Sequence, residues 1–184
     1  MCIRDRLGEL LENRIVVWNI QESRDLFANG YFGKPIGISK PNPNDINVPL
    51  ILDLIEGCYL QETSKIKIVK NGKKVSLNTL IKICKKEYHN FDKKFQVYKD
   101  FREKGYVINP GIKFGCDFAV YKKGPGIDHA PYLIQVHNKN DNISSTAVVL
   151  AGRLASSVKK QFILAIPHGK DKIDYLSLDW WKAN

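Results

Sequence analysis

Apolar residues in the first half of the chain change from a strand-like to a helical spacing. The run RIVVWNI at 14–20 is rich in β-branched residues, which predicts a strand. The prolines and asparagines of KPNPND at 40–45 are typical of a loop that ends in a helix N-cap at Asn44 or Asp45. Over 48–60 apolar positions recur at helical spacing, which predicts a helix. Its inward positions are Ile51, Leu54, Ile55, Cys58 and Tyr59.

A hairpin and a second helix follow. The stretch KIKIVKNGKKVS at 65–76 alternates apolar and lysine positions around Asn71-Gly72, a dipeptide that strongly favours a two-residue hairpin turn. SLNTLIKICKKEYHNF at 76–91 returns to helical spacing and predicts a helix. Its inward positions are Leu77, Leu80, Ile81 and Cys84.

The second half of the chain begins with a basic amphipathic helix within 92–111. Phe95, Tyr98 and Phe101 form its apolar stripe, and Gly105 closes it as a C-cap. The runs YVINPG, IKFGCDFAVYK and PYLIQVHN then alternate like the strands of a sheet.

A last helix and two strands complete the pattern. ISSTAVVLAGRLASSVKK at 143–160 predicts a helix, QFILAIP at 161–167 a buried strand, and DYLSLDWW at 174–181 an edge or final strand. The buried face of the helix is predicted to hold Ala147, Ala151, Leu154 and Val158. The whole order indicates an α+β protein with a small N-terminal domain (1–90) and a helix–strands–helix–strands domain (91–184). The first six residues, MCIRDR, carry no clear pattern.

Composition narrows the class of partner. The 184 residues include 29 Lys and Arg against 19 Asp and Glu, a net charge of +10, with 43% hydrophobic residues. This excess favours a polyanionic partner, most often nucleic acid, over a merely solvated basic surface. No apolar stretch is long enough for a bilayer, and no signal peptide is visible. Four scattered cysteines without paired spacing argue against disulfides and zinc, so we expect a reduced, cytoplasmic protein.

Three residues of the second half could carry chemistry. Tyr121 ends a strand-like run, His129 follows the turn KKGPG, and Lys160 ends the last helix. Each also has an ordinary structural explanation: an amphipathic aromatic at a strand end, a polar residue closing a turn, and a cation at a helix C-terminus. Spacing alone favours the structural explanation.

A resemblance changes this balance. The segment FREKGYVINPGIKFGCDFAVYKKGPGIDHAPYLIQV, continued in GRLASSVKKQFILAI, resembles the catalytic domain of archaeal tRNA-splicing endonucleases over 95–166. In the first half, LILDLIEGCYLQE resembles the first-domain helix of this family. The resemblance implies a small N-terminal α/β domain before a mixed-sheet, restriction-endonuclease-like nuclease domain.

The resemblance also implies an activity. The family cuts precursor tRNA at bulge-helix-bulge structures without metal or other cofactor, and leaves a 2′,3′-cyclic phosphate and a 5′-hydroxyl. Its tyrosine, histidine and lysine fall on Tyr121, His129 and Lys160, as base, acid and electrostatic stabiliser. A tyrosine has an ordinary pKa of about 10, and Lys122, Lys123 and Lys160 are the candidates that would lower the pKa of Tyr121.

Two further residues are implied as RNA contacts. Arg153 lies two turns before Lys160, so helical geometry predicts that the two share one face of the helix. Arg153 matches the family arginine that clamps a flipped bulge nucleotide, with a solvated helix face as the alternative. Lys113 in GIKFG is expected to touch backbone phosphate.

Departures from the family bear on geometry and assembly. The interval from Tyr121 to His129 is shorter than in the family, so the turn must bring the histidine round by a tighter route. The loop HGKDK at 168–172 has one acid, Asp171, where the family loop is usually acidic and enters a partner's cleft. This favours a heterotetramer with a structural subunit over a homotetramer. Trp180 and Trp181 suit either an interface or the core.

Two rival functions remain open. Asp117 with Gln135-Val136-His137 is an imperfect version of a metal-dependent nuclease motif, because the lysine is missing and only one carboxylate is present. A non-catalytic structural or RNA-binding subunit of the same endonuclease is the second rival. Retention of Tyr121, His129 and Lys160 together ranks it below a catalytic subunit.

Overall fold

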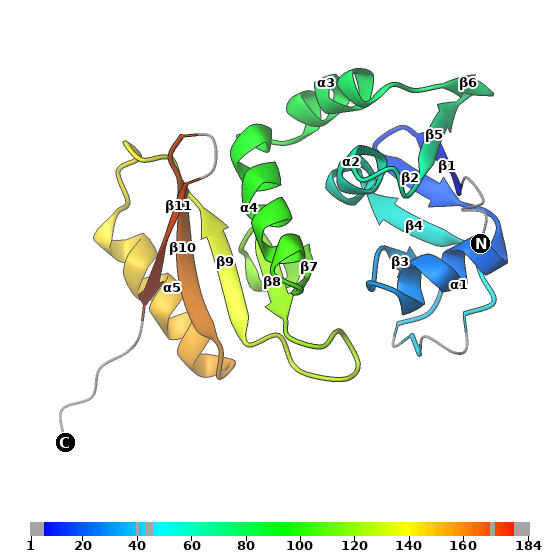
Figure 1. Cartoon of the computed structure of the whole chain (residues 1–184). Coiled ribbons are helices and arrows are strands. Elements are labelled where there is room, and N and C mark those ends of the chain that lie inside the picture. The colour runs from blue at the N-terminus through cyan, green and yellow to red at the C-terminus, as the bar shows by residue number, and fades with distance from the viewer. Residues whose placement is uncertain (1–5, 40, 43–45, 170–171, 179–184) are drawn as a thin grey trace. The chain divides into compact units, whose positions relative to one another are not determined.

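The computed structural model describes residues 6–39, 41–42, 46–169 and 172–178, and two compact units make up the chain. One unit is Met1–Phe91 and the other Asp92–Asn184 (Figure 1). The helices and two mixed sheets confirm the predicted α+β class. None of the helices in these ranges is long and apolar enough to cross a membrane.

The first unit is built on a six-stranded sheet of order β3-β4-β2-β1-β5-β6. β1 pairs with β5 in parallel, and every other neighbouring pair is antiparallel. The strands are β1 (Leu7–Leu11), β2 (Arg14–Val17), β3 (Lys34–Pro35), β4 (Leu50–Asp53), β5 (Lys67–Lys70) and β6 (Lys73–Lys74).

Three helices accompany this sheet: α1 (Ile20–Ala28), α2 (Leu54–Glu62) and α3 (Leu77–Glu87). Each begins at a residue whose side chain accepts a backbone N–H of the first turn, namely Asn19, Asp53 and Ser76. α2 lies close against the sheet, because a Cβ on Gly57 would stand 2.1 Å from Cδ1 of the buried Ile15. Glycine at this position therefore permits the helix to approach β2.

The structure confirms one predicted element of the first unit and corrects another. The hairpin at 65–76 is confirmed, with positive φ at both Asn71 (50°) and Gly72 (73°), as a two-residue I′ turn requires. The helix predicted over 48–60 is wrong at its start, because 50–53 form β4, and the helix begins only after Asp53. The helix N-cap is Asp53, and not Asn44 or Asp45 as predicted. Positions 44 and 45 lie outside the described residues.

The predicted strand at 14–20 is too long for a similar reason. β2 ends at Val17, and Asn19 caps α1, a helix that the pattern did not predict. The strand β1, at 7–11, was also missed. In contrast, α3 is confirmed, with Leu80 and Cys84 fully buried.

The second unit holds a five-stranded mixed sheet of order β11-β10-β9-β8-β7. β9 and β10 are parallel, and α5 connects them as a crossover (Figure 1). The elements are α4 (Phe91–Glu103), β7 (Val107–Pro110), the 3₁₀ turn η2 (Ile112–Phe114), β8 (Phe118–Tyr121), β9 (Tyr132–Val136), α5 (Ser145–Ser157), β10 (Gln161–Pro167) and β11 (Ile173–Leu178). The predicted basic helix is confirmed as α4, and Gly105 closes it with φ 83°.

The sheet of the second unit uses alternate side chains for its two helices. Phe118 contacts Tyr98 of α4, with ring centroids 6.1 Å apart, whereas Ala119 lies in the core cluster beneath α5. Ala151 and Leu154 of α5 and its C-cap Val158 pack on that cluster as predicted, but Ala147 is exposed. The most buried positions of the helix are Gly152 and Ala155, because the close contact with the sheet comes only in its second half.

Candidate active site

Tyr121 is the last residue of β8, and its side chain packs against the core cluster beneath α5. Its half-buried position raises the pKa of the phenol, and the nearby carboxylate of Asp128 raises it further. The expectation that lysines would lower this pKa is therefore wrong. Lys122 and Lys123 are exposed, where water screens their charge, and the ammonium group of Lys160 binds a backbone carbonyl.

The turn after Tyr121 is closed by one carboxylate. Asp128 accepts three backbone N–H groups, from Lys122 (3.0 Å), Lys123 (3.1 Å) and Gly124 (2.9 Å). The Gly124 carbonyl accepts the amides of Ile127 and Asp128 in return, each at 3.1 Å. We call this arrangement the Asp128 clamp. It returns the chain to the end of β8, so the exposed His129 follows directly on a residue bound beside Tyr121.

The Asp128 clamp also fixes the charge of its carboxylate. Partial burial acts to raise the pKa of Asp128, but the three donated N–H groups outweigh burial and lower it overall. The carboxylate is therefore ionised at neutral pH. Sequence reasoning missed this residue, because Asp128 accepts amides four to six positions before it, whereas the usual Asx turn bonds the backbone two residues further on.

Lys160 does not lie on α5, which ends at Ser157. Lys159 adopts φ 53°, and the Lys160 N–H donates to the Ala155 carbonyl at 2.8 Å, which completes a Schellman cap. The prediction that Lys160 and Arg153 share one helix face is therefore wrong, because the left-handed backbone conformation of Lys159 ends the helix between them. The reversal aims Lys160 toward the segment that follows His129.

Lys160 contacts both that segment and η2. Its Nζ donates to the Ala130 carbonyl at 2.5 Å and lies 5.3 Å from the centroid of the Phe114 ring. The next amide, of Gln161, donates to Pro131 at 2.8 Å. Partial burial lowers the pKa of Lys160 from its ordinary value. The structure thus places Lys160 beside the residue after His129, and the Asp128 clamp places His129 beside the end of β8.

The two predicted RNA contacts are both exposed. Arg153 lies on α5, with its side chain in solvent. Lys113 lies in η2 next to Phe114, the residue whose ring Lys160 covers, so η2 and Lys160 are neighbours. Lys113 is thereby brought to the side of the sheet that carries Lys160, whereas no described contact connects Arg153 with the three predicted catalytic residues.

Asp117, the residue on which the metal-nuclease rival depends, has a structural role. One carboxylate oxygen forms an ion pair with Lys94 at 2.7 Å, and the other accepts the Val136 N–H at 2.8 Å. Among the described residues, no three His, Cys, Asp or Glu side chains gather in a way that could hold a metal ion. Burial, reinforced by Asp117, raises the pKa of the neighbouring Cys116 thiol to about 11.

Comparison with known proteins decides the family. Residues 91–175 match the catalytic C-terminal domain of tRNA intron endonucleases, and residues 6–81 match the N-terminal domain of the same enzymes. The chain is 45% identical to a tRNA-splicing endonuclease of Sulfurisphaera tokodaii over 178 residues, which covers 96% of this chain and 99% of the relative. The chain belongs to the tRNA intron endonuclease family.

Other members of the tRNA intron endonuclease family align over nearly their full length. A tRNA-splicing endonuclease of Hyperthermus butylicus is 41% identical, covering 94% of this chain and 97% of the relative. One from Sulfolobus acidocaldarius is 36% identical, covering 95% and 98%. The resemblance drawn from the sequence is confirmed, and so is the enzyme class, an endonuclease of tRNA splicing.

Proposed function

We propose that this chain cuts precursor tRNA at bulge-helix-bulge structures by metal-independent transesterification. The products are a 2′,3′-cyclic phosphate and a 5′-hydroxyl. The main support is the Lys160–Ala130 hydrogen bond of 2.5 Å, because it joins the proposed lysine to the residue after the proposed histidine. Together with the Asp128 clamp, it gathers Tyr121, His129 and Lys160 at one end of the sheet of the second unit.

The reaction assigns one role to each side chain. The ribose 2′-oxygen attacks the adjacent phosphorus, and Tyr121 takes the 2′-hydroxyl proton as general base. The bond from phosphorus to the 5′-oxygen breaks, and His129 gives a proton to that leaving oxygen. The pentavalent phosphorane carries extra negative charge, which the Lys160 ammonium stabilises. One proton is taken and one is given, so the two RNA ends are the only products.

The raised pKa of Tyr121 sets the pH dependence of this mechanism. Below its pKa only a small fraction of a phenol is ionised, and that fraction grows tenfold per pH unit. Burial and Asp128 move this range upward from the ordinary value of 10.0. The cleavage rate is therefore expected to rise with pH through the neutral range, if the base is the phenolate.

Exposed cations position the RNA around the cut. Arg153 is suited to stack its planar guanidinium group on an unpaired bulge base, and Lys113 to contact a backbone phosphate. Both side chains are open to solvent, as a ligand contact requires. Replacing Arg153 by Ala should weaken binding of bulged RNA more than binding of a continuous duplex.

Single-turnover cleavage of a precursor tRNA in the presence of EDTA tests the proposal. Tyr121→Phe, His129→Ala and Lys160→Ala should each slow cleavage by a hundredfold or more, while the wild type cuts without metal and leaves cyclic phosphate. Full cleavage by Tyr121→Phe would remove the base role. EDTA-sensitive cleavage with 5′-phosphate ends would favour the metal-dependent class, and no cleavage under any condition the structural-subunit class.

The assembly we propose is a tetramer with a second kind of subunit. Support comes from the basic sequence of the loop at 168–172, where the family loop is usually acidic. Positions 170 and 171 of this loop lie outside the described residues. Light scattering followed by the cleavage assay tests it: a species that is inactive until a partner subunit is added supports the heterotetramer, and an active tetramer of this chain alone refutes it.

A further inference from the structure

The net positive charge of the first unit comes from one segment. Residues 65–86 hold eight lysines and no Asp or Glu, whereas residues 1–64 hold six Lys and Arg against nine Asp and Glu. All eight lysines are exposed. They are Lys65, Lys67, Lys70, Lys73, Lys74, Lys82, Lys85 and Lys86. The segment comprises the β5–β6 hairpin and α3, so rigid elements carry this charge (Figure 1).

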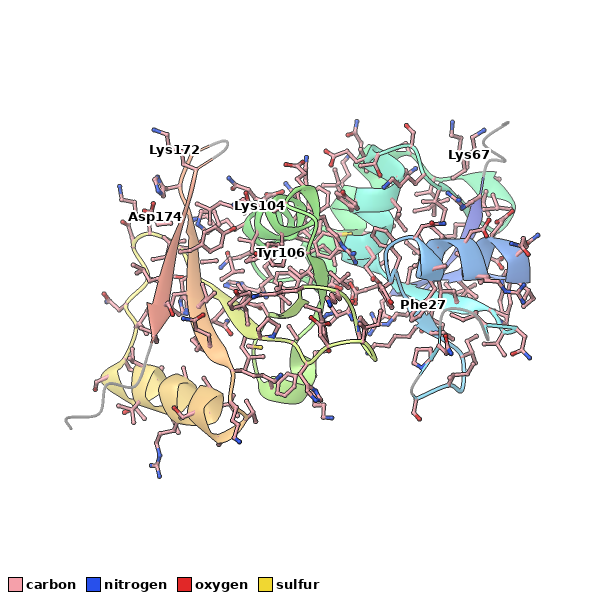
Figure 2. All side chains as sticks on the ribbon, turned by 60° about the horizontal axis from the view of Figure 1, so that its bottom comes forward. Phe27, Lys67, Lys104, Tyr106, Lys172 and Asp174 are labelled. Carbon is pink, nitrogen blue, oxygen red and sulfur yellow. The ribbon has the colours of Figure 1, made fainter. Side chains whose placement is uncertain are left out.

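Part of this segment borders a cavity. The cavity has a volume of about 390 Å³, and none of the described residues that line it carries a carboxylate. Arg6, Lys65, Lys67 and Lys74 contribute cations, and Ser64 and Ser76 contribute hydroxyl groups. Lys67, labelled in Figure 2, lies at the surface of the unit. The Lys67 amide donates to the Arg6 carbonyl at 2.7 Å, which holds the two cation-bearing segments side by side.

This chemistry fits an anionic polymer. Lysine binds phosphate as a point charge, and hydroxyl groups donate to phosphate oxygens, whereas reading of bases needs aromatic stacking or hydrogen bonds to base edges. No aromatic side chain occurs among the described residues that line the cavity. The surface is therefore suited to bind a sugar–phosphate backbone without regard to its sequence.

We propose that the β5–β6 hairpin, α3 and Arg6 form a binding surface for the RNA backbone of the tRNA body, outside the bulge-helix-bulge that the second unit cuts. We call it the hairpin surface. It rests on the proposed function, because a precursor tRNA supplies a long phosphate backbone beyond the cut site. It would add affinity for the whole precursor and would leave the chemistry at the cut unchanged.

A charge reversal on two cavity residues tests the hairpin surface. Lys65→Glu with Lys74→Glu is compared with a control of equal charge change, Lys34→Glu with Lys139→Glu, whose lysines are exposed elsewhere. Fluorescence anisotropy measures binding of a full-length precursor tRNA and of a short RNA that holds only the bulge-helix-bulge, over a series of salt concentrations. Circular dichroism confirms that both variants unfold at the wild-type midpoint.

The test variant should bind the full-length precursor about tenfold more weakly at moderate salt, with the slope of log K against log salt smaller by about 1.5, because roughly two phosphate contacts are lost. Binding and cleavage of the short RNA should stay at the wild-type level. A salt slope equal to that of the control would overturn the proposal and would favour an acidic protein as the partner of this surface. An equal loss of affinity for both RNAs would also overturn it. If the wild-type protein cuts neither RNA, alone or with its partner subunit, the proposed function fails, while the binding comparison still decides on the hairpin surface.

Discussion

Replacement of Asp128 should separate two effects of its carboxylate, one on geometry and one on the pKa of Tyr121. Oδ2 accepts the amides of Lys122 and Lys123, and Oδ1 accepts that of Gly124. In Asp128→Ala all three bonds are lost, which costs the closed turn up to about 3 kcal/mol at about 1 kcal/mol each. In Asp128→Asn one oxygen can keep two of the bonds, so the cost is about 1 kcal/mol.

These energies translate into cleavage rates if the reaction needs the closed turn. About 1.4 kcal/mol corresponds to a factor of ten, so the limiting rate should fall about fivefold in Asp128→Asn and up to about a hundredfold in Asp128→Ala. Both replacements also remove an anion that raises the pKa of Tyr121. The pKa should fall, and the rise of rate with pH should move to lower pH in both variants. Asp128 itself stays ionised in this range, because its pKa is lowered.

The assay is single-turnover cleavage of precursor tRNA at saturating protein from about pH 6 to 11, so that the range extends past the ordinary phenol pKa of 10.0. Asp141→Asn is the matched control, because Asp141 caps a different loop by accepting the Asn138 amide at 2.8 Å. It should leave both the limiting rate and the pH profile at wild-type values. An unshifted profile in both Asp128 variants would refute the electrostatic effect, and a wild-type limiting rate in Asp128→Ala would refute the geometric one.

Three predictions concern stability and are checked by urea unfolding. Gly57→Ala should lower the free energy of unfolding by about 1–3 kcal/mol, because its Cβ would lie 2.1 Å from Cδ1 of Ile15. Ile15→Val removes this Cδ1 atom and should restore part of the stability. An absence of rescue would refute this contact as the cause. Asp117→Ala should lower the free energy of unfolding by about 3 kcal/mol, because it leaves the ammonium group of Lys94 without its ion-pair partner. A loss below about 1 kcal/mol would contradict a stabilising role of this ion pair. Lys159→Gly should gain about 0.5–1 kcal/mol because glycine adopts the observed φ of 53° without steric cost, and a loss would show that the side chain itself stabilises the cap.

Much of the fold follows from local patterns, and the errors arise where one short element changes into another without a loop. Asp53 both ends β4 and caps α2 through a capping box with Glu56. Apolar residues flank Asp53 on both sides, so helical spacing was read across the strand. The same occurs at Asn19, where β2 gives way to α1. At such junctions the side-chain cap, and not the periodicity, locates the boundary.

The site was predictable in its residues but not in its connections. Tyr121, His129 and Lys160 follow from the resemblance, since their local motifs have ordinary structural explanations. The Lys160–Ala130 bond depends on a Schellman cap at a lysine, a position where glycine is usual, so no sequence signal marked the reversal. The pKa of Tyr121 depends on tertiary burial and on a carboxylate seven residues away, which spacing alone cannot weigh.

The carboxylate bonds of the Asp128 clamp fix the two ends of the turn separately from its tip. These hydrogen bonds hold residues 122–124 to Asp128, while Gly126 and Ile127 are exposed between them. Extra residues inserted between Gly126 and Ile127 would take the Ile127 and Asp128 amides away from the Gly124 carbonyl. They would add little closure entropy, because the cost of a loop grows slowly with its length. The tip can therefore accept an inserted peptide or a fluorescent reporter, which would report RNA arrival from a few residues before His129 without displacing Tyr121.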